Sequence, residues 1–93
     1  MTLHASRQFS ISDQVLSQEV NGETVLLNLE GEAYFSLNEV GTRIWQLLAD
    51  GKPLGEIHDI LQTQFVVDAE RCKSDVDEFV ADLLNRNLVR LVN

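Results

Sequence analysis

The block from Tyr34 to Leu48 constrains the fold most strongly, because a strand pattern in it runs directly into a helix pattern. Tyr34, Phe35 and Leu37 suit a pleated, half-buried strand. Asn38 follows, and its side-chain oxygen can accept hydrogen bonds from the first free N–H groups of a helix. Apolar residues at helical spacing then indicate the helix itself: Val40, Ile44, Leu47 and Leu48, with Trp45 widening the stripe. This junction leaves one sheet edge lying beside helices.

The composition is that of one globular domain. The chain has 93 residues, 44% of them hydrophobic, which suffices for a single packed core and makes disorder unfavourable. No apolar run approaches the roughly 20 residues that a membrane-spanning helix needs, and no secretory signal is recognisable. The single cysteine, Cys72, cannot form an internal disulfide. The expected location is therefore the cytoplasm.

The charge argues against a nucleic-acid partner. Fifteen acidic residues face seven basic ones, and the formal net charge is −8. A protein that contacts phosphates needs a basic face. The basic residues that gather loosely in the second half are surrounded by acidic ones: Arg71, Lys73, Arg86 and Arg90. The acidity either keeps the chain soluble or attracts a basic or amphipathic partner, and both interpretations stay open.

The first half of the chain predicts an antiparallel meander. Its strands are expected at Val15–Val20, Glu23–Leu29 and Ala33–Leu37. Asn21 and Gly22 both tolerate a positive φ, which is typical of a tight hairpin turn. Val25, Leu27 and Leu29 share one face of the second strand because side chains alternate along a strand.

The two ends of the chain carry weaker patterns. Residues 1–8 are expected to form a loose arm. Phe9 and Ile11 alternate with serines and predict either a short strand or a docking segment. Residues 88–92 form an apolar tail that is expected to pair with the sheet or to pack under it.

Three helices are predicted for the second half. The first runs from about Glu39 to Ala49 and is closed by Gly51 in the left-handed conformation. The second begins near Pro53 without a convincing capping side chain. The third begins after Asp68 and is stopped by Asn87. Its apolar stripe contains Cys72, Val76, Phe79, Val80, Leu83 and Leu84.

Strands followed by helices predict an α+β fold: a three-stranded antiparallel sheet followed by a three-helix winged-helix-like bundle. The sheet needs the helical layer, since so few strands are not stable alone. The domain is expected to span residues 1–93, with a core of about 15–92.

No catalytic, metal or cofactor site is predicted. His4 and His58 are far apart in sequence, and one cysteine cannot complete a zinc site with them. His58 is expected to be an exposed helix residue, and Cys72 a buried, unreactive thiol. The carboxylates of the third helix are interpreted as a solvated face: Asp75, Glu78 and Asp82. The chain is therefore not expected to be an enzyme.

Several segments together resemble the PqqD-like family, whose domain is also called the RiPP recognition element. RiPP denotes a ribosomally made, post-translationally modified peptide. The segments that carry the resemblance are Leu26–Leu29, Tyr34–Gly41 and Ile44–Leu48 with Gly51. The resemblance covers about Val15 to Val92, and the block around Trp45 is most similar to stand-alone members from lasso-peptide clusters. Asn87 departs from the family, where glycine is more usual.

The resemblance implies a non-catalytic adaptor that captures the leader of a precursor peptide by β-strand addition. It implies presentation of that leader to a modifying enzyme, such as a radical SAM enzyme or a cyclase, or to a leader peptidase. Neither nucleic acid nor membrane is implied as a partner, and the chain is expected to be a monomer or a homodimer.

In the family the leader lies beside the third strand, in a groove against the third helix. On this chain the implied strand edge consists of Glu32, Ala33, Tyr34, Phe35 and Ser36. The helix side chosen to face it consists of Arg71, Asp75, Glu78, Phe79, Asp82 and Arg86. Lys73 and Asp77 mark the other side of the same helix.

Ordinary structural roles compete with these assignments. Phe35, Leu37 and Trp45 suit the core, and Tyr34 can be an exposed strand tyrosine. A second hypothesis is a winged-helix DNA-binding or regulatory protein, because the same fold serves both functions. The expected second helix, however, offers no Lys or Arg. A third hypothesis is self-association through the open sheet edge.

Overall fold

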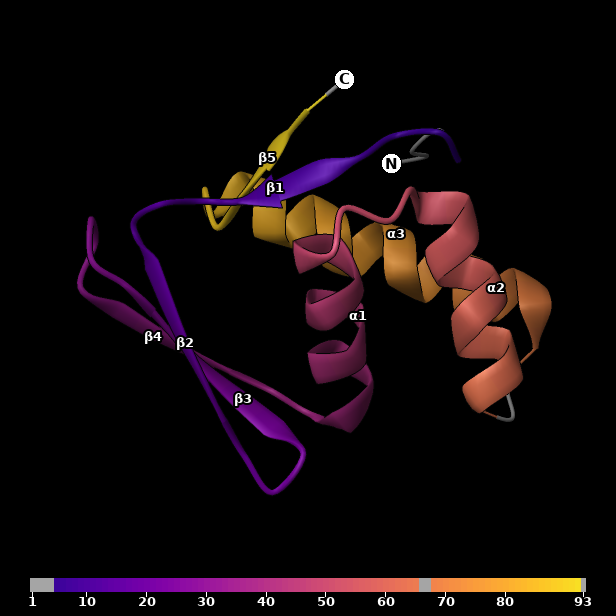
Figure 1. Cartoon of the computed structure of the whole chain (residues 1–93), viewed down its shortest axis with the longest axis horizontal. Coiled ribbons are helices and arrows are strands. Elements are labelled where there is room, and N and C mark those ends of the chain that lie inside the picture. The colour runs from indigo at the N-terminus through magenta and orange to yellow at the C-terminus, as the bar shows by residue number, and fades with distance from the viewer. Residues whose placement is uncertain (1–4, 66–67, 93) are drawn as a thin grey trace.

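The computed structural model describes residues 5–65 and 68–92, in which the predicted α+β class is confirmed (Figure 1). The element order is β1 (Phe9–Ile11), β2 (Val15–Val20), β3 (Glu23–Asn28), β4 (Ala33–Leu37), α1 (Glu39–Ala49), α2 (Leu54–Gln64), α3 (Ala69–Asn85) and β5 (Val89–Leu91). No helix within these ranges is both long enough and apolar enough to cross a membrane.

The predicted meander forms a three-stranded antiparallel sheet in the order β2-β3-β4. Asn21 and Gly22 have φ values of 54° and 81°, so the hairpin turn uses the positive φ that the sequence predicts. Strand β3 ends one residue earlier than expected. There the Asn28 side chain accepts a hydrogen bond from the Glu30 N–H at 3.1 Å, which favours a turn over a continued strand.

The two ends of the chain form a second, two-stranded sheet. Phe9 lies opposite Leu91, and Ile11 lies opposite Val89 in antiparallel β1 and β5. The segment at Phe9 is therefore a strand. The apolar tail pairs with this strand and not with the meander, whose order is β2-β3-β4.

The segment before β1 is held against the start of α2. The Gly55 N–H donates to the Ala5 carbonyl at 2.8 Å, and the Leu54 N–H donates to the Arg7 carbonyl at 3.1 Å. These carbonyls satisfy free N–H groups of a helix that has no side-chain cap. The expectation of a loose arm is wrong for residues 5–8, while residues 1–4 lie outside the described part of the chain.

The predicted caps of the other helices are confirmed. Asn38 accepts a hydrogen bond from the Gly41 N–H at 2.8 Å, and Asp68 accepts one from the Arg71 N–H at 3.1 Å. The two predicted left-handed stops have positive φ: 81° at Gly51 and 59° at Asn87. Local sequence therefore determines where α1 and α3 begin and where each of them ends.

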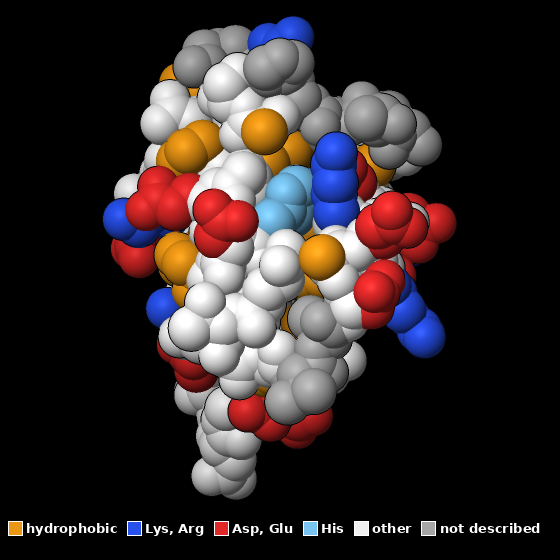
Figure 2. All heavy atoms as spheres, turned by 90° about the vertical axis from the view of Figure 1, so that its right-hand side faces the viewer, with side chains coloured by type: hydrophobic (Ala, Val, Ile, Leu, Met, Phe, Trp, Pro, Cys, Tyr) orange, Lys and Arg blue, Asp and Glu red, His pale blue; other side chains and the backbone are white. Residues whose placement is uncertain are grey.

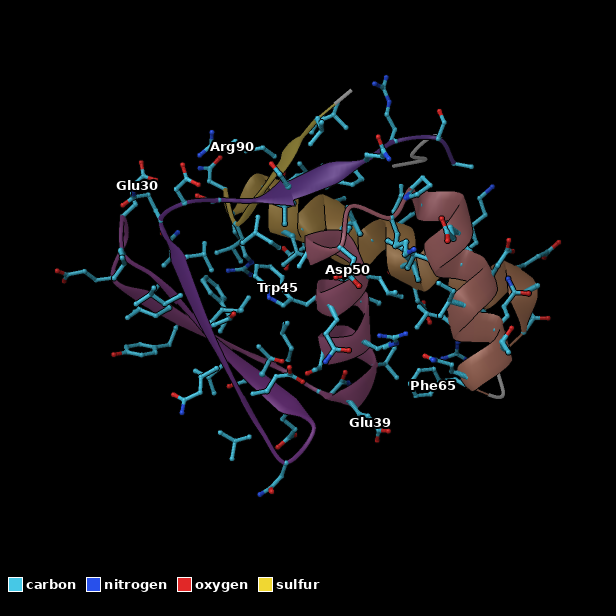
Figure 3. All side chains as sticks on the ribbon, viewed as in Figure 1. Glu30, Glu39, Trp45, Asp50, Phe65 and Arg90 are labelled. Atoms are coloured by element: carbon cyan, nitrogen blue, oxygen red, sulfur yellow. The ribbon has the colours of Figure 1, made fainter. Side chains whose placement is uncertain are left out.

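The core lies between one face of the three-stranded sheet and the helices. Leu26 of β3 and Trp45 of α1 are both buried there, and Trp45 projects from α1 towards the sheet (Figure 3). The Thr24 hydroxyl donates to the Thr42 hydroxyl at 2.9 Å, so a buried hydrogen bond also joins β3 to α1. The core role expected for Trp45 is confirmed. These contacts fix β4, which runs straight into α1, relative to the helices.

Candidate functional site

Strand β4 is an edge strand. It pairs with β3 on one side, and no described strand pairs with it on the other. An edge strand offers unpaired N–H and C=O groups to another chain. Among the described residues, the protein's own backbone does not occupy this edge.

A hollow of about 340 Å³ lies between β4 and α3. Its lining comprises Tyr34, Phe35, Ser36 and Leu37 of β4, Phe79, Asp82 and Leu83 of α3, and Arg86 and Leu88, which follow that helix. The strand edge and the third helix therefore form two sides of one depression. The other edge of the sheet, β2, does not line this hollow.

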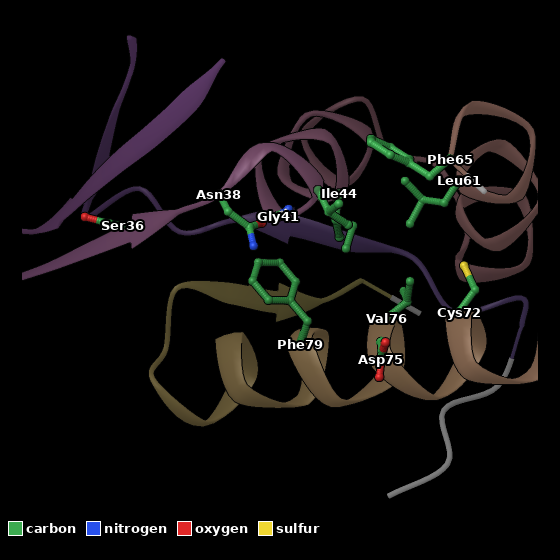
Figure 4. Close-up of a pocket in the computed structure, with 11 residues that line it drawn as sticks. Ser36, Asn38, Gly41, Ile44, Leu61, Phe65, Cys72, Asp75, Val76 and Phe79 are labelled. Carbon is green, nitrogen blue, oxygen red and sulfur yellow. Dashed lines mark hydrogen bonds between the residues drawn. The ribbon is translucent and has the colours of Figure 1, made fainter. Parts of the chain in front are cut away.

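A second hollow of about 440 Å³ continues from the first between α1, α2 and α3 (Figure 4). Its lining comprises Ser36, Asn38, Val40, Gly41, Ile44, Leu61, Phe65, Cys72, Asp75, Val76 and Phe79. Ser36 and Phe79 line both hollows, so the two are neighbouring parts of one depression, here called the β4–α3 groove. Most of its lining residues are apolar, and acidic residues of α3 lie at its border.

Phe79 occupies the junction between the two parts of the groove. Figure 4 shows its ring beside Asn38 and Gly41, at the start of α1. A Cβ atom on Gly41 would lie 3.4 Å from the Phe79 Cζ atom. Because glycine has no side chain, the ring can lie directly against the first turn of α1.

Charged groups line the end of the groove near Arg86. The Arg86 guanidinium lies 4.9 Å from the centroid of the Phe35 ring, within range of a cation–π interaction. Its Nε atom also donates to the Asp82 carboxylate at 3.0 Å. Arg86 thus joins α3 to β4 across the groove and partly neutralises the acidic side of the helix.

Cys72 contributes an apolar surface to the groove. It is buried, as the sequence predicts. Burial raises the pKa of the Cys72 thiol, and the negative charge of Asp75 raises it further. The thiol therefore stays protonated near neutral pH and is a poor nucleophile.

The structure brings most of the predicted site residues to the groove. Those that line it are Tyr34, Phe35, Ser36, Asp75, Phe79, Asp82 and Arg86. Ala33, Arg71 and Glu78 line neither hollow. Glu32 also lies outside it, and it is not part of the strand edge: it belongs to the turn before β4 and has a φ of 52°. The predicted edge therefore begins one residue too early.

The sequence did not identify the groove residues from the first two helices. Val40 and Ile44 of α1, together with Leu61 and Phe65 at the end of α2, line its larger part. Apolar spacing assigned them to helix stripes, and the spacing was correct. The spacing of apolar residues does not predict where two packed helices leave a gap between their apolar faces.

His58 is buried, so the expectation of an exposed residue is wrong. Its side chain lies between α2 and α3, and its Nε2 atom lies 3.2 Å from the Asp77 Oδ1 atom. The signal was available, because His58 shares the helical spacing of Leu54, Ile57 and Leu61. Asp77 therefore faces α2, and this side of α3 does not line the groove.

The described residues contain no group of three or more His, Cys, Asp and Glu that could hold a metal ion. Figure 2 shows one face of the surface, where acidic side chains lie on both flanks and hydrophobic ones are scattered. The β4–α3 groove offers apolar side chains for binding, and the free edge of β4 beside it offers backbone hydrogen-bonding groups.

An open strand edge beside a groove, on a helical bundle, defines a class of small domains that can accept an extended chain as an additional strand. The sequence profile described as Coenzyme PQQ synthesis protein D (PqqD) matches residues 23–89. This chain belongs to the PqqD family, as the resemblance in its sequence implied.

Two solved structures resemble the chain closely. One, "TbiB1 in Complex with the TbiA(beta) Leader Peptide", is 40% identical, with a TM-score of 0.83 over 87% of this chain and 94% of that one. The other, "Lasso peptide synthetase B1 complexed with the leader peptide", is 20% identical, with a TM-score of 0.82 over 89% of this chain and 98% of that one. At this lower identity the likeness concerns the fold alone. No curated protein sequence gives a significant match.

Proposed function

We propose that this chain is an adaptor that binds the leader of a ribosomally made precursor peptide and presents it to the enzyme that modifies or cleaves the precursor. The leader adds to the free edge of β4 as a further strand. The observation that carries this proposal is the position of that edge, which lies directly beside the β4–α3 groove.

The groove and the edge supply different parts of the binding energy. Hydrogen bonds from the β4 backbone give affinity that does not depend on the leader's side chains. Alternate side chains of an added strand point to the same side. Those that point towards α3 enter a groove lined by Phe35, Phe79 and Leu83. The groove therefore selects leaders with apolar side chains at alternate positions.

The acidic side of α3 adds a preference for charge. Asp75 and Asp82 line the groove, and Glu78 is exposed on the same helix. Their carboxylates favour a leader with basic residues next to its apolar ones. Such a leader would be the basic or amphipathic partner that is one of the two interpretations of the acidic composition.

The relatives support the same function. TbiB1, 40% identical, was solved in complex with the TbiA(beta) leader peptide. The adaptor is proposed to act as a single domain without catalysis of its own, in the cytoplasm, as a monomer or a homodimer. Its enzyme partner is a modifying enzyme, such as a radical SAM enzyme or a cyclase, or a leader peptidase.

Nothing in the structure favours the DNA-binding alternative. Helix α2 has no Lys or Arg, and its histidine, His58, is buried against Asp77. Arg71 of α3 lies 3.7 Å from Asp75, and Arg86, which follows α3, lies 3.0 Å from Asp82, so both cations are close to carboxylates of this helix. A recognition helix needs free cations that reach phosphates and bases.

A titration followed by amide chemical shifts tests the proposal. The probes are the leader of the precursor encoded beside this chain and the TbiA(beta) leader, with a scrambled leader as the control. We expect the largest shifts in Ala33–Leu37 and in residues 79–86, at the end of α3 and just after it. Shifts confined to α2, or equal shifts with the scrambled leader, would contradict leader binding at this edge. Retention of random duplex DNA at low salt would revive the alternative.

A further inference from the structure

The three-stranded sheet has a second face, turned away from the helices and here called the outer sheet face. Leu16 of β2, Leu27 of β3 and Tyr34 of β4 lie opposite one another across the sheet, and Val25 lies opposite Gln18 and Ser36. Side chains directly opposite each other in an antiparallel sheet lie on the same face. The outer sheet face comprises Leu16, Gln18, Val20, Glu23, Val25, Leu27, Tyr34 and Ser36.

Large apolar side chains on this face are exposed. Leu16 is 55% exposed, Val25 42% and Tyr34 72%. Helix α1 covers the opposite face, where Leu26 is buried, and Figure 1 shows the helices together on one side of this sheet. A row of exposed apolar residues on one flat face is typical of an interaction surface.

The charge around this face has one sign. The segment Val15–Leu37, which builds the whole sheet, contains no Lys, Arg or His. Glu23 lies on the outer sheet face, and Glu30 and Glu32 lie in the turn between β3 and β4. Glu19 lies on the helix-facing side, where it accepts a hydrogen bond from the Gln46 side chain. A partner that covers the apolar row therefore needs basic residues at its border. A second copy of this chain offers no Lys or Arg from its own sheet to pair with Glu23, which disfavours self-association through this face.

The outer sheet face is continuous with the leader-binding edge. A strand added to β4 extends the sheet by one position, and every second side chain of that strand joins the outer face beside Tyr34 and Ser36. Any protein seated on this face would contact both the adaptor and the bound leader. A protein that binds the outer sheet face can therefore recognise whether a leader is bound.

We propose that the outer sheet face docks the enzyme that processes the precursor, through an enzyme surface with an apolar centre and Lys or Arg at its border. This inference rests on the proposed function, because the enzyme meets a sheet to which the leader has added a strand.

The test measures enzyme binding and leader binding separately. The probes are the purified modifying enzyme or leader peptidase encoded beside this chain and the fluorescently labelled leader. The double variant L16K/V25K places charge on the outer sheet face and leaves the β4–α3 groove intact. Leu91→Lys is the matched control, since Leu91 is an exposed apolar strand residue in the other sheet. Circular dichroism and thermal unfolding verify that each variant is folded.

We expect L16K/V25K to weaken enzyme binding by about tenfold or more, as loss of interface anchors does. Leader affinity should be unchanged, and Leu91→Lys should change neither. Glu23→Gln should weaken enzyme binding and reduce its dependence on salt. Unchanged enzyme binding in L16K/V25K would overturn the proposal.

Two further outcomes are distinguishable. A wild-type dimer that L16K/V25K converts to a monomer would show that a second copy covers the face, and would overturn enzyme docking. Enzyme binding is therefore measured with and without leader, alongside the mass of the chain in solution. Absence of leader binding in the wild type would instead contradict the proposed function, while the enzyme-binding comparison would still decide the role of the outer sheet face.

Discussion

The His58 Nε2 atom lies 3.2 Å from the Asp77 Oδ1 atom, and this contact joins α2 to α3 inside the bundle. The two residues are only 6% and 5% exposed. Each satisfies a polar group that would otherwise be buried without a partner. Because α2 and α3 both line the larger part of the β4–α3 groove, the pair also fixes the distance between two of its walls.

Removal of the carboxylate should therefore destabilise the whole fold. Asp77→Ala leaves the imidazole of His58 buried without a partner, and we expect the free energy of unfolding to fall by about 1–3 kcal/mol. Asp77→Asn should cost less, since an amide can still bond to the ring. Urea denaturation measures both. Asp59→Ala, on the exposed side of α2, is the control and should stay within about 0.5 kcal/mol of the wild type. Equal losses in Asp77→Ala and Asp59→Ala would contradict a structural role for the pair.

Phe79 is expected to carry much of the affinity for the leader, since its ring lines both parts of the groove. Phe79→Ala should weaken leader binding by about tenfold, the usual cost of removing a central aromatic anchor. Fluorescence polarisation with labelled leader measures this. Lys73→Ala, at an exposed position of α3 that does not line the groove, should bind as the wild type does. Wild-type affinity in a folded Phe79→Ala variant would exclude the groove as the leader site.

The segment before β1 should stabilise the start of α2. A Cβ atom on Gly55 would lie 3.1 Å from the Ala5 Cβ atom, so Gly55→Leu should displace the segment and its hydrogen bonds. We expect faster amide exchange at Leu54 and a loss of about 1–2 kcal/mol in the free energy of unfolding. Gly31→Leu is the matched control, because a Cβ atom there meets nothing within 4 Å. Unchanged exchange at Leu54 would show that α2 does not depend on this segment.

Cys72 should react slowly with thiol reagents. Its pKa is raised by burial and by Asp75, so at pH 8 less of it is thiolate than of a free cysteine. The alkylation rate should rise at a higher pH than for an unfolded cysteine, and bound leader should slow it further because Cys72 lines the groove. Ser74→Cys in a Cys72→Ser background gives an exposed thiol on the same helix for comparison. Equal rates at both positions would contradict the burial.

Local chemistry made much of this fold predictable. Asn38, Asp68 and the Asn21-Gly22 turn act through backbone groups a few residues away, so the sequence contains the whole interaction. The same holds for Asn87, which takes the left-handed conformation that the sequence predicts.

Pairings between distant segments were not predictable in the same way. The sequence around Phe9 does not indicate that Leu91 lies opposite it. The sequence around Gly55 likewise does not indicate that its N–H donates to the Ala5 carbonyl. Each local segment is compatible with several partners, and only the packed core decides among them. His58 is a different case, because its helical spacing indicated burial while its residue type suggested exposure.

The sequence predicted the two elements that border the groove but not the helix residues that line its larger part. The family resemblance predicted that β4 and α3 face each other. Seven of the eleven site residues that it implied line the groove. The contributions of Ile44, Leu61 and Phe65 depend on gaps between packed helices, which no periodicity encodes.

The antiparallel pairing of Phe9 with Leu91 places the first and last described strands side by side, while residues 5–8 continue from Phe9 along the start of α2. A module with adjacent entry and exit can be spliced into a surface loop of another protein without stretching either host or guest. The paired strands β1 and β5 are therefore the place at which an artificial fusion would join this fold to another protein.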